Sequence, residues 1–193
     1  MHDTAHATRP GFALNLPNAI TIARVLMVPL LIVLIFRAPG GSLAALLVFA
    51  VLAASDIVDG HLARSRNDVT TFGKLMDPLA DKLLIASTLA ALVILDRLPL
   101  WVAVVIVARE VAVTVLRAVA VRKGHVISAS ALGKMKMSLQ IAMVGALVSA
   151  VDPAAGWVQA LIYATVVITI ASGLDYFARF ARTGRRVLVR ARR

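Results

Sequence analysis

The sequence contains no cysteine and few acidic or aromatic residues. Without cysteine, disulfide bonds and thiolate chemistry are excluded. Only ten of the 193 residues are Asp or Glu, against 21 Lys or Arg, so the net charge is +11. A nucleic-acid surface would interleave basic and aromatic side chains, but the chain has two Trp, two Tyr and no such patch. We therefore expect anionic lipid to be the partner of this positive charge.

What the chain has in abundance is apolar residues. Hydrophobic residues make up 60% of it, and the mean hydropathy is +0.87, which is typical of proteins that fold in a bilayer. We expect one all-α membrane domain over residues 1–193, with no internal repeat. Its parts are a cytoplasmic lead-in at 1–15, six transmembrane helices and a basic cytoplasmic tail at 181–193. The expected helices cover residues 18–36, 42–64, 74–95, 100–121, 131–151 and 157–180.

The positions of Lys and Arg predict the orientation of these helices. Arg37 and Arg97 stand almost alone on one side, whereas the 2–3 and 4–5 connections and the tail hold most other cations. Basic connections remain in the cytoplasm, so both termini are expected there. We therefore predict a multi-pass protein of the cell membrane whose aspartate-rich helix ends face the cytoplasm.

Four of the ten acidic residues lie close together at the ends of two apolar segments. They are Asp56, Asp59, Asp77 and Asp81. On helices, the three-residue step of the first pair and the four-residue step of the second each place two carboxylates on one face. Carboxylates beside hydrocarbon are costly unless a cation neutralises them. The two pairs can face each other, and their four negative charges match two divalent cations.

The ligand chemistry narrows the choice of metal. All-oxygen ligands are hard, and the chain has no thiolate, so Mg²⁺ or Mn²⁺ is favoured over Zn²⁺. Aspartates that only terminate helices are the simpler interpretation, and this accounts for Asp77 alone. It does not account for the full pattern D-x2-D-G-x2-A-R-x8-G-x3-D-x3-D, in which eight residues keep register over 26 positions.

This pattern resembles the signature of the CDP-alcohol phosphotransferases. The resemblance implies a membrane enzyme that moves a phosphatidyl group from CDP-diacylglycerol to an alcohol and releases CMP. It implies that Asp56, Asp59 and Asp77 bind the metal pair, and that Asp81 binds metal and acts as the general base. By the same resemblance, the residues expected to bind CDP-diacylglycerol are Asn18, Thr21, Gly60, Ala63, Arg64, Thr70 and Gly73.

Further charged residues within the fourth and fifth expected helices suggest the kind of acceptor. They are Arg109, Arg117, Lys134 and Lys136, against the single acid Glu110. A cationic alcohol would require carboxylates or an aromatic cage, whereas an excess of positive charge favours a phosphorylated alcohol whose phosphate these four residues bind. Two structural interpretations remain open. Glu110, Thr114 and Arg117 share a helix face and could form a buried polar network, and the two lysines could anchor the helix at the membrane surface.

Within the family, the likeness is greatest to the phosphatidylglycerophosphate synthases, which implies sn-glycerol 3-phosphate as the acceptor and a homodimer. It rests on Asn15 to Pro29 and on Gly133-Lys134-Met135-Lys136, among other segments. The alternative acceptors are inositol phosphate, and phosphatidylglycerol as in cardiolipin synthases. A small cation transporter is the non-enzymatic alternative. It is disfavoured because transporters place such acids near mid-bilayer and often have repeated halves.

Overall fold

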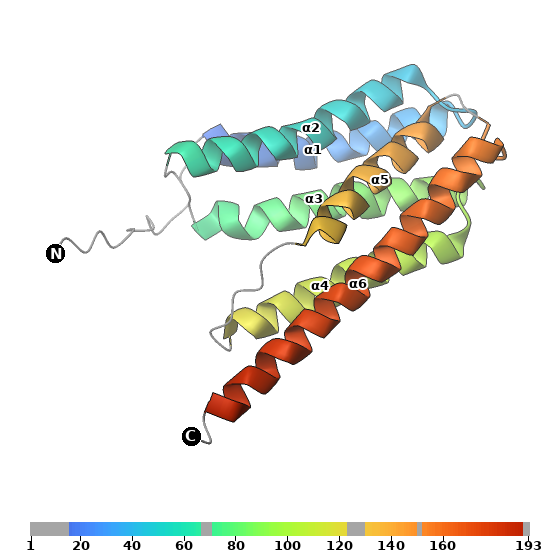
Figure 1. The fold of residues 1–193 in the computed structure, drawn as a ribbon. Helices are drawn as coiled ribbons and strands as arrows, with labels where there is room; N and C mark the ends of the chain where they lie inside the picture. The colour runs from blue at the N-terminus through green and yellow to red at the C-terminus, as the bar shows by residue number, and fades with distance from the viewer. Residues whose placement is uncertain (1–15, 67–70, 123–129, 150–151, 191–193) are drawn as a thin grey trace. The chain divides into compact units, whose positions relative to one another are not determined.

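The computed structural model of the chain describes residues 16–66, 71–122, 130–149 and 152–190. Within the helices, the side chains of residues 16–18, 56–66, 71–78, 81 and 183–190 lie outside the description. The described residues form helices and connecting turns without any strand, which confirms the all-α prediction for them (Figure 1). The helices are α1 (Leu16–Arg37), α2 (Leu43–Arg66), α3 (Thr71–Ile94), α4 (Leu100–Arg122), α5 (Ala131–Val148) and α6 (Gly156–Arg190).

Three helix ends differ from the prediction. The α3 helix begins at Thr71 rather than near residue 74, so Pro78 lies inside the helix and not at its start. The α5 helix ends at Val148, three residues early, because Ser149 turns to an extended conformation and its N–H still donates to the Gly145 carbonyl. The α6 helix continues to Arg190, since residues 181–190 contain no proline and are rich in Arg, a good helix former. Most of the expected tail is therefore helix.

Three of the six helices are long and apolar enough to cross a membrane within the described part of the chain. Their apolar segments are Ala19–Arg37, Ala131–Val148 and Gly156–Arg182. The α2 and α3 helices contribute shorter apolar segments, Leu43–Ser55 and Lys82–Ile94. The α4 helix has the length to span, but every membrane-length window of it contains Arg109, Glu110 and Arg117. The arrangement of six spans stays a prediction.

The chain divides into two compact units, residues 1–91 and residues 92–193. In the first unit, α1 and α2 pack side by side as an antiparallel pair (Figure 1). The turn between them needs Gly41, whose φ of 103° is a conformation that L side chains rarely adopt. The N–H of Gly41 donates to the carbonyl of Ala38 at 2.8 Å and closes that turn. Leu31 and Phe49 are fully buried between these helices and their neighbours.

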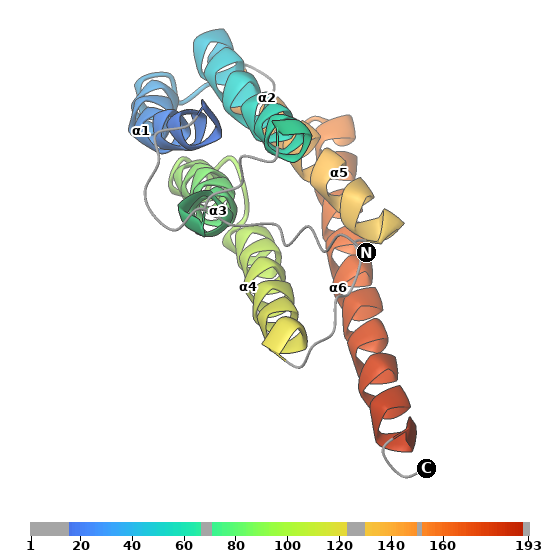
Figure 2. The same ribbon diagram turned by 90° about the vertical axis from the view of Figure 1, so that its left-hand side faces the viewer.

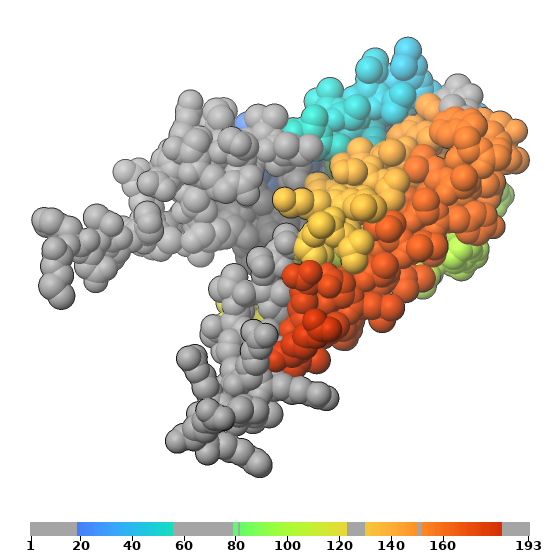
Figure 3. Space-filling view, in the orientation of Figure 1, coloured from blue at the N-terminus to red at the C-terminus, as the bar shows by residue number. Residues whose placement is uncertain are grey.

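In the second unit, α6 packs against both α4 and α5 (Figure 2). The space-filling view shows the side chains of α5 and α6 meeting without a gap along their shared length (Figure 3). The core consists of buried apolar side chains from all three helices, including Ile106, Met143, Leu147 and Ile162. On α6, the Thr165 hydroxyl lies 2.7 Å from the Leu161 carbonyl and 3.4 Å from the Leu139 carbonyl, at the α5–α6 boundary.

Arg97, in the turn before α4, closes the far end of α5. Its Nε donates to the Leu147 carbonyl at 2.7 Å, and its Nη2 donates to the Ser149 carbonyl at 2.9 Å. Arg97 is only 8% exposed. Burial lowers the pKa of Arg97, while the negative charge of Asp152 opposes that change. An arginine keeps its charge through such a shift, so it can satisfy carbonyls that the helix end leaves without partners.

We expect Arg97→Ala to destabilise the second unit by about 2 to 4 kcal/mol, because two buried carbonyls lose a charged donor. Thermal unfolding of the detergent-solubilised protein measures this as a lower Tm. Arg37→Ala, which removes an exposed arginine at the end of α1, should leave Tm unchanged. Equal Tm values for the two variants would contradict the capping role of Arg97.

Candidate functional site

The first part of the candidate site is the aspartate run, whose backbone is helical as predicted. Asp56 and Asp59 lie in α2, and Asp77 and Asp81 lie in α3, all within the first unit. Each pair therefore shares a helix face, at a step of three or four residues. Their side chains lie outside the described part of the structure. Among the side chains that are described, no three His, Cys, Asp or Glu residues gather to hold a metal ion.

The donor set itself fits divalent cations. Four carboxylates supply hard oxygen ligands, and the helical spacing presents them in two pairs on neighbouring segments of one unit. Magnesium and manganese prefer such ligands. The predicted metal-binding residues are therefore compatible with the local structure, and their assignment stays a prediction.

A buried arginine lies directly beside the beginning of the aspartate run. Arg24 on α1 is 1% exposed, and its Nε donates to the Ser55 hydroxyl at 3.1 Å. That hydroxyl donates in turn to the Leu52 carbonyl at 2.8 Å. Because Ser55 precedes Asp56, this chain of contacts holds α1 against the first turn of the motif. Thr21, three residues before Arg24 and therefore on the same helix face, is also buried.

The other residues expected to bind CDP-diacylglycerol can be placed only in part. Five of them lie in helices with side chains outside the description, namely Asn18, Gly60, Ala63, Arg64 and Gly73. Thr70 lies outside the described residues altogether. Thr21 is thus the one expected donor-binding residue whose side chain the structure describes, and it lies inside the first unit next to Arg24.

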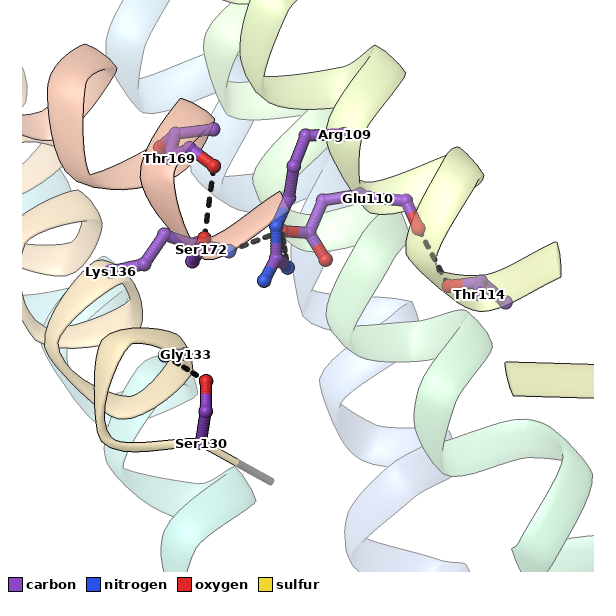
Figure 4. A network of polar contacts seen from close by, with 8 residues as sticks. All are labelled: Arg109, Glu110, Thr114, Ser130, Gly133, Lys136, Thr169 and Ser172. Atoms are coloured by element: carbon purple, nitrogen blue, oxygen red, sulfur yellow. Dashed lines mark hydrogen bonds and ion pairs between the residues drawn. The ribbon is translucent and has the colours of Figure 1, made fainter. Parts of the chain in front are cut away.

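The second part of the candidate site is a basic cluster, by which we mean Arg109, Glu110 and Lys136 (Figure 4). One oxygen of the Glu110 carboxylate, Oε1, accepts from Arg109 Nη1 at 3.2 Å and also from Lys136 Nζ. Lys136 comes from α5 and is 7% exposed, while the other two residues come from α4 and are partly buried. The cluster therefore joins two helices and carries a net charge of one positive unit.

Local contacts of α5 and α6 position the basic cluster. Ser130 begins α5 by accepting the Gly133 N–H with its hydroxyl at 3.2 Å, a typical N-cap (Figure 4). On α6, a methyl group added at Gly173 would lie 3.4 Å from Cγ of Arg109. The stem of Arg109 therefore packs against α6 at Gly173. The Ser172 hydroxyl donates to the Thr169 carbonyl at 2.9 Å and so is satisfied within its own helix.

The structure separates the four residues expected to bind the acceptor phosphate. Arg109 and Lys136 come together at Glu110, whereas Lys134 is exposed on α5. Arg117 is exposed on α4, with its guanidinium carbon 6.0 Å from the centre of the Tyr176 ring. Neighbours two apart on a helix point about 200° apart, so the structure selects Lys136 over Lys134 as the buried cation.

Two pairings expected from the sequence have different outcomes. The network of Glu110 with Thr114 and Arg117 was predicted within α4, but Thr114 donates to the Glu110 backbone carbonyl at 2.7 Å, and the carboxylate binds Arg109 and Lys136. A prediction based on helical spacing within α4 could not show that the second cation comes from α5. The second pairing that the sequence predicts is between Asp175 and Arg179, which are four residues apart on one helix face, and it is confirmed: Nε of Arg179 lies 3.0 Å from both carboxylate oxygens.

Four buried polar atoms in the described part of the structure have no hydrogen-bond partner. They are Arg109 Nε, Gln140 Oε1, Thr169 Oγ1 and the Tyr176 hydroxyl. All four belong to the second unit, and an unpaired buried polar group is costly, which is why such groups are few. Gln140 and Thr169 were not among the predicted site residues. Gln140 could have been identified from the sequence, because it lies four residues after Lys136 and therefore on the same face of α5.

The family model for CDP-alcohol phosphatidyltransferases matches residues 14–171 of this chain. This range includes the whole aspartate run and the basic cluster. Unlike a short motif, it extends over five helices and into the sixth.

Several bacterial proteins are similar over most of the chain. A Bacillus subtilis protein named CDP-diacylglycerol–glycerol-3-phosphate 3-phosphatidyltransferase is 37% identical over 182 residues, which cover 86% of this chain and 94% of that protein. A Mycobacterium tuberculosis protein named probable phosphatidylglycerophosphate synthase is 40% identical over 87% of this chain and 82% of its own length. A Streptomyces coelicolor cardiolipin synthase is 41% identical, but the match covers 58% of this chain and 54% of that protein.

We expect Lys136→Met to lower stability by about 1 to 3 kcal/mol, because it leaves a partly buried carboxylate with one cation fewer. Lys134→Met changes the same residue type two positions away at an exposed site and should stay within about 0.5 kcal/mol. Tm of the purified proteins in one detergent separates the two variants by several degrees. If both variants melt together with the unaltered protein, the ion pair contributes nothing to the fold.

Proposed function

Because this chain belongs to the CDP-alcohol phosphatidyltransferase family, we propose that it transfers the phosphatidyl group of CDP-diacylglycerol to sn-glycerol 3-phosphate and releases CMP. The observation that carries the choice of acceptor is the pair of cations, the partly buried Arg109 and the buried Lys136, that the Glu110 carboxylate holds together. A phosphate monoester supplies the negative charge that such a pair requires. The names of the relatives that match most of the chain support the same acceptor.

Asp56, Asp59, Asp77 and Asp81 are proposed to hold two divalent cations, Mg²⁺ or Mn²⁺. Four carboxylates on two helices of one unit, in a chain without cysteine, support this assignment. When bound, these ions supply the positive charge that the diphosphate of CDP-diacylglycerol and its leaving group require. The nucleotide end of the donor is proposed to lie along Gly60, Arg64 and Thr70. Asn18, Thr21, Ala63 and Gly73 complete the proposed donor site.

Asp81 is proposed to act as the general base. It removes the proton from the primary hydroxyl of sn-glycerol 3-phosphate as that oxygen attacks the lipid-side phosphorus of CDP-diacylglycerol. A new phosphorus–oxygen bond forms to the acceptor, and the bond from this phosphorus to the CMP oxygen breaks. The products are phosphatidylglycerophosphate, CMP and the proton carried by Asp81.

The acceptor end of the proposed reaction rests on the basic cluster. Arg109 presents planar N–H donors that suit phosphate oxygens, and its buried Nε has no partner among the described residues. Lys136 adds a second positive charge from another helix. Arg117 and Lys134 are exposed, and we propose that they attract the anionic substrate from solution.

The membrane arrangement that goes with this chemistry is six spans, both termini in the cytoplasm and a reaction centre at the cytoplasmic face of the cell membrane. The three membrane-length apolar helices and the basic connections support it. Such an arrangement lets sn-glycerol 3-phosphate arrive from the cytosol and the lipid donor enter sideways from the inner leaflet. A homodimer is proposed from family resemblance.

The purified protein should release CMP from CDP-diacylglycerol when sn-glycerol 3-phosphate and Mg²⁺ or Mn²⁺ are present, and chelation by EDTA should abolish the release. The measurement is CMP formation together with identification of the lipid product. Inositol phosphate and phosphatidylglycerol serve as competing acceptors in parallel reactions.

Product with either competing acceptor, and none with sn-glycerol 3-phosphate, would overturn the choice of acceptor. Absence of CMP with every acceptor and metal would overturn the enzymatic proposal and favour a cation transporter. The partial match to a cardiolipin synthase makes phosphatidylglycerol the more informative of the two competitors.

Asp81→Asn should lower kcat by about 100-fold to 10,000-fold at saturating metal, as expected for loss of a general base. Asp96→Asn is the matched control. Asp96 is an exposed turn residue with φ of 54°, a conformation that Asn also tolerates, so its turnover should be unchanged. Near-normal turnover by Asp81→Asn would show that another group takes the proton.

A further inference from the structure

Glu110 is the only glutamate of the chain, and it binds two cations that come from different helices. Both contacts use the same carboxylate oxygen, Oε1, so Arg109 Nη1 and Lys136 Nζ are brought to a single point (Figure 4). Two positive groups do not approach each other in a partly buried place unless a negative charge lies between them. Glu110 supplies that charge.

The two cations depend on Glu110 to different degrees. The stem of Arg109 packs against α6 at Gly173, where a methyl group would lie 3.4 Å from Cγ, so packing already restricts its position. Lys136 has a flexible four-carbon stem, and the contact that ties its ammonium to α4 is the one with Glu110. Without the carboxylate, repulsion from Arg109 would drive the Lys136 ammonium away.

Glu110 leaves donors available while it holds the two side chains together. It accepts from Nη1 of Arg109, whereas Nε of Arg109 is buried and has no partner within the described residues. The Lys136 ammonium has three N–H donors, of which the carboxylate oxygen takes one. A tetrahedral oxyanion beside the cluster could accept from both cations without displacing Glu110.

We infer that Glu110 is a positioning residue for the acceptor site, which holds the Lys136 ammonium beside Arg109 so that both cations meet one phosphate group. This inference rests on the proposed function, because it assigns that phosphate to the acceptor alcohol. Glu110 touches neither substrate. Its effect on the reaction passes through Lys136, and it concerns the acceptor rather than CDP-diacylglycerol.

The test is a double-mutant cycle in the full-length protein, with Glu110→Gln, Lys136→Gln and the double variant. The Michaelis constants for sn-glycerol 3-phosphate and for CDP-diacylglycerol are measured separately at saturating metal. Each single variant should raise KM for sn-glycerol 3-phosphate about tenfold, the scale of one charged hydrogen bond, and change kcat and KM for the lipid less than threefold. The double variant should resemble Lys136→Gln alone, because the contact through which Glu110 acts on the acceptor site is already lost once the ammonium is gone.

The matched control is Asp175→Asn. It removes another carboxylate of the second unit, one whose ion pair is with the exposed Arg179. Its acceptor KM should equal that of the unaltered protein. Tm of every variant is measured in the same detergent, and the kinetics are run below the lowest Tm, so that unfolding does not contribute to KM.

Three results would overturn the inference. Additive losses in the double variant would show that Glu110 acts independently of Lys136. Equal increases in KM for both substrates would show a general structural role. A lower acceptor KM in Glu110→Gln would show that the carboxylate competes with the phosphate. If the unaltered protein is active with sn-glycerol 3-phosphate, any of these outcomes contradicts only the positioning role of Glu110. If the unaltered protein is inactive, the proposed function itself is contradicted.

Discussion

The need to satisfy cations that are buried among apolar helices governs how the described helices meet. An unpaired charge costs several kcal/mol when it leaves water, so each buried cation has a partner and the partner decides which helices meet. Glu110 joins α4 to α5 through Lys136. Arg24 reaches Ser55 and joins α1 to α2. Arg97 holds the end of α5 through two carbonyl groups. Polar contacts thus determine which helices are joined, where apolar packing alone would not specify the partner.

The two parts of the candidate site belong to different units. The acidic run belongs to residues 1–91, and the basic cluster belongs to residues 92–193. For the proposed reaction this division has a chemical sense, because metal-bound diphosphate requires carboxylates, whereas a free phosphate monoester requires cations. Each half of the reaction then has residues of the appropriate sign.

Local sequence signals predicted the helices well because their causes are local. Each apolar run is a property of one continuous segment, and the observed helices begin and end within a few residues of the expected positions, apart from the end of α6. The end of α6 differs from the prediction because residues 181–190, expected as a basic cytoplasmic tail, are rich in arginine, a good helix former, and continue the helix. The early α5 end depends on Ser149, whose conformation the sequence pattern did not indicate.

The sequence by itself determined the family, the helical class and the helical spacing of the four aspartates, since these depend on residue identity and on steps of three and four. Only the tertiary structure decided which cations meet. Helical periodicity places Glu110 near Thr114 and Arg117, but a carboxylate binds the cations that packing brings to it. Here the stem of Arg109 packs against α6 at Gly173, and α5 buries Lys136 rather than Lys134. Such contacts between distant segments leave no local periodic signal, because they depend on how whole helices pack.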